Sequence, residues 1–250
     1  ISGATSSTYT LTQSDVGKYV RVFTSYTDSQ GGVESHTGMM GTTVSNVNDA
    51  NTGTPTLSGT QAEDSTLTVS ATPLTGNDED GMTGSSYTYQ WQRCTSNSAS
   101  SCSDVSGSTS TTYLLGQADT DKFIRAAVSY VDDYSTTETV YTVFTSQIGN
   151  INDAPSAGAD QTGAVTEDAS TSTATGTVAG TDDDDSASLT YTPSTTSGTY
   201  GSIAFSGAAW TYTLNNADAD TNALAAGASV SDAFTVTVTD GTASDLTHIH

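Results

Sequence analysis

The sequence predicts an all-β protein of tandem β-sandwich modules in an elongated array. Residues 1–26 return at 105–130 with an offset of 104, and 13 of these 26 positions are identical. The same offset relates Asn48-Asp49-Ala50 to Asn152-Asp153-Ala154. Most segments are short alternations of apolar and polar residues between turn residues, without a long helical period. A fixed period of this length indicates repeated modules rather than one large domain.

The offset divides the chain into three parts. Residues 1–50 are the C-terminal half of a module, and residues 51–151 are a complete module. Residues 152–250 are a third module whose last strand is incomplete. We therefore expect the sequence to be a segment of a longer protein.

The complete module carries the strand signals of an immunoglobulin-like sandwich. About seven short strands in about 100 residues, with a large aromatic residue near the third, are typical of that fold. The predicted strands include Thr66–Val69, Tyr87–Gln92, Tyr113–Leu115, Phe123–Tyr130 and Thr139–Phe144.

The third module has a different pattern of strands. The predicted strands are Leu189–Tyr191, Ser202–Phe205, Trp210–Leu214 and Phe234–Thr239. Residues 215–227 are rich in Ala and Asn, so we expect a short helical or coiled crossover there. These signals predict another β-sandwich.

The first 150 residues resemble the bacterial immunoglobulin-like repeats of giant surface proteins. Residues 15–19 are similar to the D-x-G-x-Y corner of immunoglobulin domains, in which the Tyr hydroxyl pins a turn. The copy departs from that corner, because Asp121 replaces Gly17 and Phe123 replaces Tyr19. The residues that carry the wider resemblance are Tyr89–Cys94, Cys102, Tyr113, Asp119 and Arg125.

Residues 155–250 closely resemble the VCBS, or cadherin-like, repeat of bacterial adhesins of the RTX type. The motifs that carry this resemblance are Gly198–Gly201, Trp210–Leu214, Asn222–Gly227 and Phe234–Gly241. The resemblance implies an extracellular, calcium-binding β-sandwich that serves as a spacer in a large adhesin.

The charge balance excludes two classes of partner. The chain has 28 acidic residues against five basic ones, which are Lys18, Arg21, Arg93, Lys122 and Arg125. Such a surface repels nucleic acid and anionic lipid, and no apolar run is long enough to insert into a bilayer. The carboxylates need counter-charges, and we expect cations from solution to supply them. The alternative is that the acidity serves only solvation or life in salt.

Calcium is the cofactor that these residues predict. Ca²⁺ takes about six to eight hard oxygen ligands, which carboxylates, Asn side chains and backbone carbonyls supply. The junctions Asn48-Asp49 and Asn152-Asp153 resemble the N-D-x-A-P linker of cadherins, where Asn and Asp hold ions between successive domains. Four consecutive aspartates at 182–185 repel one another unless a cation lies among them. The alternative is an ordinary soluble turn, where Asp and Asn are favoured anyway.

The candidate calcium ligands fall into junction residues, acidic pairs at the heads of the modules, and acidic loops. They are Asn48, Asp49, Asn152 and Asp153 at the junctions; Glu63, Asp64, Glu167 and Asp168 at the heads; and Asp78, Asp80, Asp132, Asp133, Asp182, Asp184 and Asp240 in the loops. We expect the head pairs to complete the junction sites.

Cys94 and Cys102 are expected to form a disulfide that closes one hairpin. Closing a loop of about nine residues contributes on the order of 2–3 kcal/mol in the chain-entropy model. A cysteine pair without nearby Cys or His partners is a poor zinc site. Two reduced thiols are the alternative, whereas a disulfide indicates an oxidising exterior.

Catalysis finds little support, and we expect no enzyme. The sequence lacks a G-x-S-x-G elbow, an H-E-x-x-H motif and a phosphate-binding glycine loop. Paired carboxylates are so abundant that any one pair is a weak sign of a glycosidase. His248 and His250 alternate with Thr247 and Ile249, so we interpret them as strand residues rather than metal ligands.

The sequence therefore predicts structural extender modules of a bacterial extracellular adhesin or surface fibre, stiffened by calcium at the module junctions. The expected partners are neighbouring modules of the same chain, and the expected location is the bacterial cell surface. Two alternatives stay open. One is an adhesive module that binds a glycan or a protein, and the other is a segment of a self-assembling extracellular filament whose partners are other copies.

Overall fold

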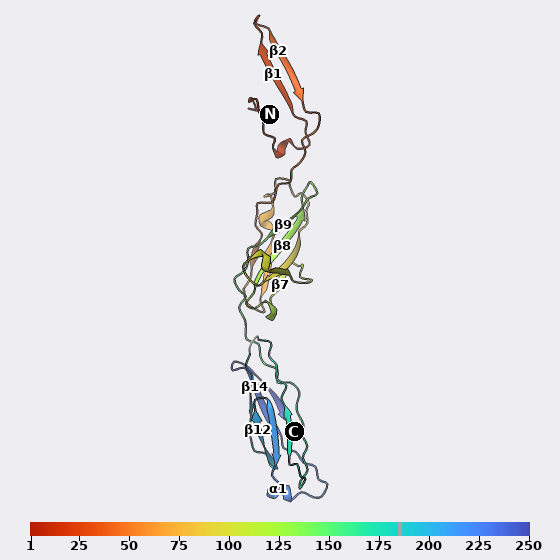
Figure 1. The fold of residues 1–250 in the computed structure, drawn as a ribbon, viewed down its shortest axis with the longest axis vertical. Coiled ribbons are helices and arrows are strands. Elements are labelled where there is room, and N and C mark those ends of the chain that lie inside the picture. Colours follow the sequence, from red (N-terminus) through yellow and green to blue (C-terminus); the bar gives the residue numbers. More distant parts are fainter. Residues whose placement is uncertain (185–186) are drawn as a thin grey trace. The chain divides into compact units, whose positions relative to one another are not determined.

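The computed structural model describes residues 1–184 and 187–250 (Figure 1). They form two compact units, Ile1–Ile148 and Gly149–His250. Strands make up most of the regular structure in both, which confirms the all-β prediction. The described α-helix, α1 (Ala219–Asn222), is short and lies in the crossover that the sequence predicts at 215–227.

The first unit contains a hairpin and two further sheets. The hairpin pairs β1 (Arg21–Thr27) with β2 (Val33–Met39). The strand orders of the two sheets are β3-β4-β7 and β6-β5-β8-β9. Their bounds are β3 Thr56–Ser58, β4 Thr66–Ser70, β5 Thr88–Cys94, β6 Cys102–Asp104, β7 Thr112–Leu114, β8 Phe123–Val131 and β9 Thr137–Tyr141. The unit also contains four 3-10 turns: η1 Gln13–Asp15, η2 Thr72–Leu74, η3 Ala99–Ser101 and η4 Gln117–Asp119.

The two sheets of residues 51–148 share one apolar core. Leu67 and Val69 enter it from β4, and Trp91 enters it from β5. Alternate residues of β8, among them Ile124 and Val128, point into the same core and are fully buried. Each such side chain stabilises the fold by about 1.5–3 kcal/mol. The shared core makes this region a β-sandwich, as predicted.

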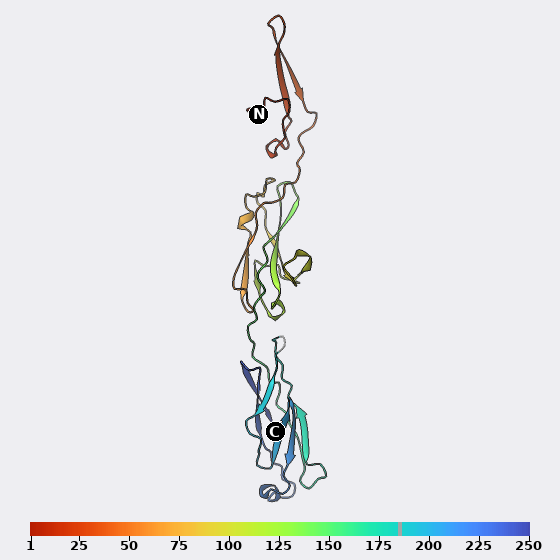
Figure 2. The ribbon, with the colours of Figure 1, turned by 60° about the vertical axis from the view of Figure 1, so that its left-hand side comes forward.

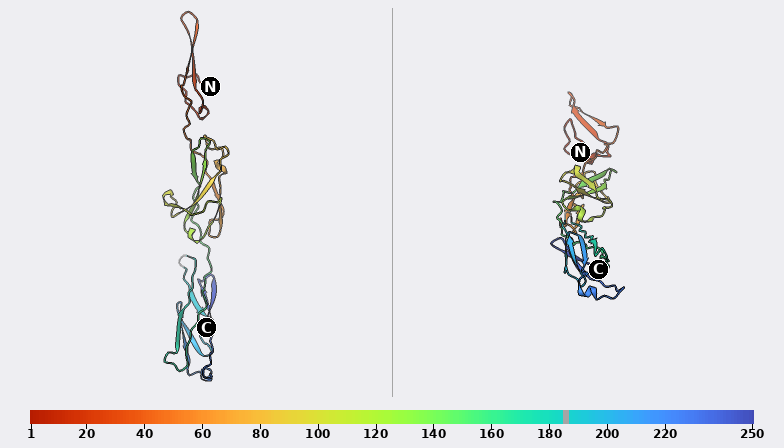
Figure 3. Two further views of the ribbon diagram at one scale, coloured as in Figure 1. Left: turned by 90° about the vertical axis from the view of Figure 1, so that its right-hand side faces the viewer. Right: turned by 60° about the horizontal axis from the view of Figure 1, so that its bottom comes forward.

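The β1–β2 hairpin lies one repeat period before β8 and β9 in the sequence, but no second sheet within residues 1–50 packs against it (Figure 3). Every residue of both strands is exposed. Val22, Phe23 and Tyr26 are 58%, 67% and 56% exposed, respectively. The physical reason is that residues 1–50 contain no counterpart of β5 or of the sheet that covers β8.

A tyrosine–aspartate bond pins η1 and η4, which lie one period apart. Asp15 accepts the Tyr9 hydroxyl at 2.9 Å, and Asp119 accepts the Tyr113 hydroxyl at 2.8 Å. Burial, together with the bond to Asp119, raises the pKa of Tyr113 to about 12. Tyr19, the tyrosine of the predicted corner, is 60% exposed instead. The residue that pins this turn therefore precedes the aspartate rather than following it.

The second unit is a sandwich of two three-stranded sheets with orders β10-β13-β12 and β11-β14-β15 (Figure 2). Ile203 and Trp210 enter the core from the first sheet, and Phe234, Val236 and Val238 enter it from the second. β15 pairs with all of β14. The bounds are β10 Thr173–Thr177, β11 Thr190–Pro193, β12 Gly201–Ser206, β13 Ala209–Leu214, β14 Phe234–Thr239 and β15 Ser244–Ile249.

Gly176, inside β10, makes room for the indole of Trp210. A Cβ atom at this position would lie 2.5 Å from Cζ2 of Trp210 and 2.7 Å from Nε1. The indole is buried, so it has little freedom to move away. A glycine inside a strand often marks such a close approach.

Gly176→Ala is therefore expected to destabilise the second unit by about 1–3 kcal/mol, because the added methyl group overpacks the core. Thr175→Ala is the matched control, since Thr175 is exposed on the same strand and should change stability by only about 0.5 kcal/mol. Urea unfolding followed by tryptophan fluorescence measures both. Equal stabilities of the Gly176→Ala and Thr175→Ala variants would contradict the packing argument.

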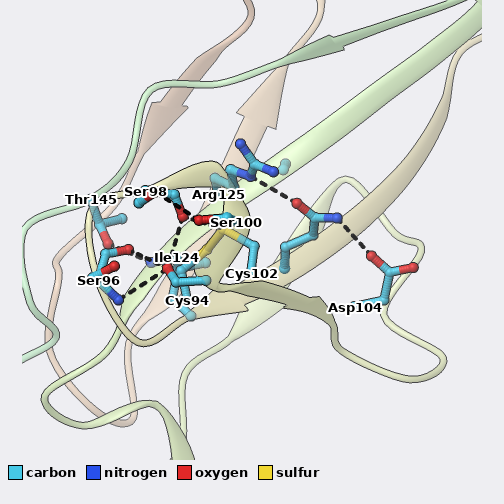
Figure 4. Close-up of a disulfide and its surroundings, with 12 residues drawn as sticks. Cys94, Ser96, Ser98, Ser100, Cys102, Asp104, Ile124, Arg125 and Thr145 are labelled. Carbon is cyan, nitrogen blue, oxygen red and sulfur yellow. Dashed lines mark hydrogen bonds between the residues drawn. A yellow bond between two sulfur atoms is a disulfide. The ribbon is translucent and has the colours of Figure 1, made fainter.

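Cys94 and Cys102 form the predicted disulfide (Figure 4). They are direct partners across the β5–β6 pair. Beside them, Nε of Arg125 donates to Oε1 of Gln92 at 2.7 Å, and Nε2 of Gln92 donates to Asp104 at 2.7 Å. The disulfide therefore closes a hairpin that strand pairing and side-chain bonds already hold.

Reduction of this disulfide is expected to lower the stability of the 51–148 sandwich by about 2–3 kcal/mol, since the closed loop is short. Residues 51–148 should still unfold cooperatively. Denaturant unfolding with and without reductant measures the difference, and Cys94→Ala/Cys102→Ala serves as the permanently reduced control. Complete loss of the folded signal, or no change at all, would contradict this expectation.

Candidate metal centre

Asp80 lies at the centre of a polar cluster where the chain enters the 51–148 sandwich. It is 2% exposed. Its Oδ2 accepts the backbone N–H of Asp49 at 2.8 Å, and its Oδ1 accepts Nε2 of Gln13 at 2.8 Å. The same Gln13 nitrogen donates to Oδ1 of Asn46 at 3.0 Å. Asp80 therefore joins the linker to η1.

Asp78 supports Asp80 from within the same loop. The backbone N–H of Asp80 donates to Oδ1 of Asp78 at 2.9 Å. The Tyr130 hydroxyl donates to Oδ2 of Asp78 and accepts Nδ2 of Asn51 at 2.9 Å. Burial, and then the bond to Asp78, raises the pKa of Tyr130. The tyrosine thus stays a neutral donor that fixes this carboxylate.

A second acidic turn lies beside this loop. Oδ1 of Asp132 accepts the backbone N–H groups of Tyr134 at 2.8 Å and Thr136 at 2.7 Å. Its Oδ2 is buried and has no hydrogen-bond partner within residues 1–184 and 187–250. Asp133 accepts the backbone N–H of Thr83 at 2.7 Å, which ties the turn to the residues that follow Asp80. A buried carboxylate oxygen without a partner is costly unless a cation faces it.

Asn48 contacts the same end of the sandwich, because its Nδ2 donates to Oε1 of Glu138 at 2.8 Å. Sequence reasoning missed five participants. These are Gln13, Asn46, Asn51, Tyr130 and Glu138. The predicted residues that the structure places at this end are Asn48, Asp49, Asp78, Asp80, Asp132 and Asp133.

The second unit repeats this arrangement with its own residues. Oδ2 of Asp184 accepts the backbone N–H of Asp153 at 2.8 Å, and its Oδ1 accepts Nδ2 of Asn150 at 2.6 Å. The backbone N–H of Asp184 donates to Oδ1 of Asp182 at 2.9 Å. Asn150, Asp153, Asp182 and Asp184 lie one period after Asn46, Asp49, Asp78 and Asp80.

Asp240 and Asn152 extend the second cluster. Nδ2 of Asn152 donates to Oδ2 of Asp240 at 2.9 Å. Oδ1 of Asp240 accepts the backbone N–H groups of Thr242 at 2.6 Å and Ala243 at 2.7 Å. These N–H groups hold the pKa of Asp240 below its usual range. Asp240 is therefore ionised at neutral pH and available to a cation.

The donor set of the second cluster fits a hard dication. Carboxylate oxygens of Asp153 and Asp184 lie within 4.8 Å of each other. At an effective dielectric constant of about 20, two unit charges at that distance repel by roughly 3 kcal/mol. Oδ2 of Asp182 is buried without a hydrogen-bond partner in the part of the chain that the structure describes. Oxygen donors of this kind suit Ca²⁺, and the chain has no Lys or Arg after Arg125 to take its place.

The other predicted ligands are the acidic pairs at the heads of the modules. Asp64 and Asp168 adopt left-handed backbone angles, with φ of 58° and 56°. The backbone N–H of Asp64 donates to the carbonyl of Leu115, beside η4. Along the sequence, β4 lies between Glu63-Asp64 and the acidic loop at 78–80, and β10 lies between Glu167-Asp168 and the acidic loop at 182–184. That these pairs complete the junction sites stays a prediction. Asp185, in the predicted four-aspartate run, lies outside the described residues.

None of the helices in the described residues has the length and apolar character needed to cross a bilayer.

Part of this chain matches a known protein family. Residues 152–249 match the family described as bacterial cadherin-like domain. No curated protein matches the chain. The match covers the stretch for which the motifs predicted a cadherin-like repeat, so that prediction is confirmed.

Three solved structures cover most of the chain at low identity. The extracellular cadherin domains 1–5 of protocadherin gamma B2 share 12% identity over 92% of this chain and 45% of theirs, with a TM-score of 0.40. The protocadherin gamma B4 extracellular domain shares 14% over 93% and 38%, with a TM-score of 0.33. The endo-fucoidan hydrolase MfFcnA4 of glycoside hydrolase family 107 shares 17% over 93% and 33%, with a TM-score of 0.23. The chain spans less than half the length of each of these proteins.

Proposed function

We propose that this chain is a set of non-catalytic structural modules of a bacterial extracellular adhesin or surface fibre, stiffened by calcium where the linker meets a sandwich. The observation that carries the proposal is the Asp80 cluster, which draws the linker, η1 and two acidic loops together. The cluster around Asp184 contains hydrogen bonds of the same kind one period later. The disulfide supports an oxidising location outside the cell.

In this proposal Asp49, Asp78, Asp80 and Asp132 hold the ion of the first unit. Asp78 and Asp80 are already oriented by backbone and tyrosine bonds. The orphaned Oδ2 of Asp132 supplies a further oxygen. When bound, calcium would neutralise the crowded carboxylates.

Stiffening follows from the source of the ligands. Asp49 belongs to the linker, whereas Asp80 and Asp132 belong to loops of the sandwich. An ion that binds all three removes backbone freedom from the linker, and fixing one residue costs about 1–2 kcal/mol of entropy. Ion binding supplies that free energy, so the linker is ordered only while the ion stays.

Calcium is expected to raise the unfolding midpoint of the chain relative to the same protein in EDTA. A ligand that binds only the folded state at about 100 times its Kd contributes roughly 2.7 kcal/mol. Thermal unfolding in EDTA, in millimolar Ca²⁺, and in NaCl of matched ionic strength measures the effect. An identical midpoint in Ca²⁺ and in the NaCl control would reject the proposal.

Asp80→Asn is expected to remove most of the calcium-dependent shift of the 51–148 sandwich. Glu79→Gln is the matched control, because Glu79 is exposed in the same loop and its substitution removes the same charge. Asp184→Asn and Asp183→Asn form the equivalent pair in the second unit. The difference between EDTA and Ca²⁺ is compared for each variant, so any intrinsic cost of the substitution cancels. Equal losses in Asp80→Asn and Glu79→Gln would indicate general charge screening.

A further inference from the structure

The side chains of His248 and His250 lie on one face of β15 and its extension. Residues two apart on a strand share a face. The two ring centroids lie 6.1 Å apart, with planes inclined by 20°. His250 continues the extended chain beyond Ile249, because its N–H donates to the carbonyl of Gln161 at 3.0 Å and its carbonyl accepts the N–H of Gly163 at 2.9 Å. Backbone pairing therefore fixes the spacing of the two imidazoles.

Asp160 orients the ring of His248. Oδ1 of Asp160 lies 3.2 Å from Nδ1 of His248 and accepts that residue's backbone N–H at 2.8 Å. It also accepts the hydroxyl of Thr247 at 3.3 Å. A carboxylate beside Nδ1 favours the tautomer that carries its proton there, which leaves the lone pair on Nε2. This carboxylate–imidazole pairing is the support that metal-ligating histidines usually have.

We propose that His248 and His250 form a binding site for a borderline divalent cation of the Zn²⁺ class, with Asp160 as the positioning residue. Imidazole nitrogen suits Zn²⁺, Cu²⁺ or Ni²⁺, whereas Ca²⁺ prefers oxygen, so this site differs in kind from the acidic clusters. Both rings reach solvent, where water completes the coordination. No Lys or Arg follows Arg125, so the negative field around the second unit concentrates cations near the pair.

The sequence pattern alone favoured strand residues over ligands. The structure shows His248 in β15, as that interpretation requires. It adds what the sequence could not give, namely the aspartate that approaches His248 from 88 positions away. His248 can therefore be both a strand residue and a ligand, because alternate residues of a strand lie on one face.

The experiment titrates the full chain with Zn²⁺ in an excess of Ca²⁺, so that oxygen sites are filled by calcium. Competition with a chromophoric zinc indicator gives the affinity, and ¹⁵N NMR of the imidazoles identifies the ligand atoms. The expected result is one Zn²⁺ per chain with shifted Nε2 signals of both rings. His248→Gln or His250→Gln should abolish this binding. His36→Gln is the control, because His36 stacks on Tyr26 in the β1–β2 hairpin.

Asp160→Asn tests the positioning role. The affinity for Zn²⁺ should fall about 10-fold or more, and the His248 tautomer should shift in the metal-free ¹⁵N spectrum. Unchanged affinity and tautomer would overturn the role of Asp160. Zinc uptake that survives both His248→Gln and His250→Gln, or no uptake at all, would overturn the site. These outcomes are independent of the calcium proposal, since the ¹⁵N signals report on the imidazoles themselves whether or not Ca²⁺ binds elsewhere.

Discussion

The loops of this chain depend on hydrogen bonds from backbone N–H groups to carboxylate oxygens. Asp80 and Asp184 each hold a linker N–H, and Asp132 and Asp240 each hold two N–H groups of a turn. Asp232 holds three consecutive N–H groups and the Tyr212 hydroxyl. Bonds to charged groups contribute about 1.5–3 kcal/mol each, so these aspartates act as turn anchors. With five basic residues in the chain, few ammonium or guanidinium groups can do the same. Because every anchor is an acidic side chain, order in the loops brings carboxylates together, and that constraint makes a cation site a natural consequence of the fold.

Much of the strand pattern was predictable, and the failures have identifiable causes. β4, β8 and β14 begin at Thr66, Phe123 and Phe234, as the apolar alternation predicts. β10 was missed because its sequence, Thr-Ala-Thr-Gly-Thr, offers no large apolar residue. The inward positions of β10 are small since the Trp210 indole, delivered by β13, fills the space there. Periodicity in a single sequence reveals a strand whose own large apolar side chains enter the core. It does not reveal a strand whose small residues pack against a large side chain from a neighbouring strand.

The candidate site was predictable where one motif carries it and not where tertiary structure assembles it. The junction residues and the acidic loops stand out because they recur with the period. Gln13 could not be singled out, since it reaches Asp80 across 67 positions and an exposed glutamine carries no signal by itself. The acidic pairs at the heads of the modules, which begin at Glu63 and Glu167, were expected to complete the junction sites, and that expectation stays a prediction. The repeat therefore identified the chemistry of the site, whereas long-range contacts such as that of Gln13 come from the tertiary structure.

Repetition separates two kinds of cation chemistry in this chain. The oxygen clusters recur with the period, at Asp49 and Asp153 and at Asp80 and Asp184, so they are a property of the repeated module. The imidazole pair does not recur, because the 51–151 module contains no histidine. A repeated site serves what every module must do, which is to hold its entering linker against crowded negative charge. An unrepeated site placed on a rigid strand serves this module alone. Ligand hardness keeps the two apart, since calcium has little affinity for imidazole nitrogen and zinc of the same charge accepts it readily. The chain can therefore carry a local cation site without disturbing the cation chemistry on which its repeated architecture depends.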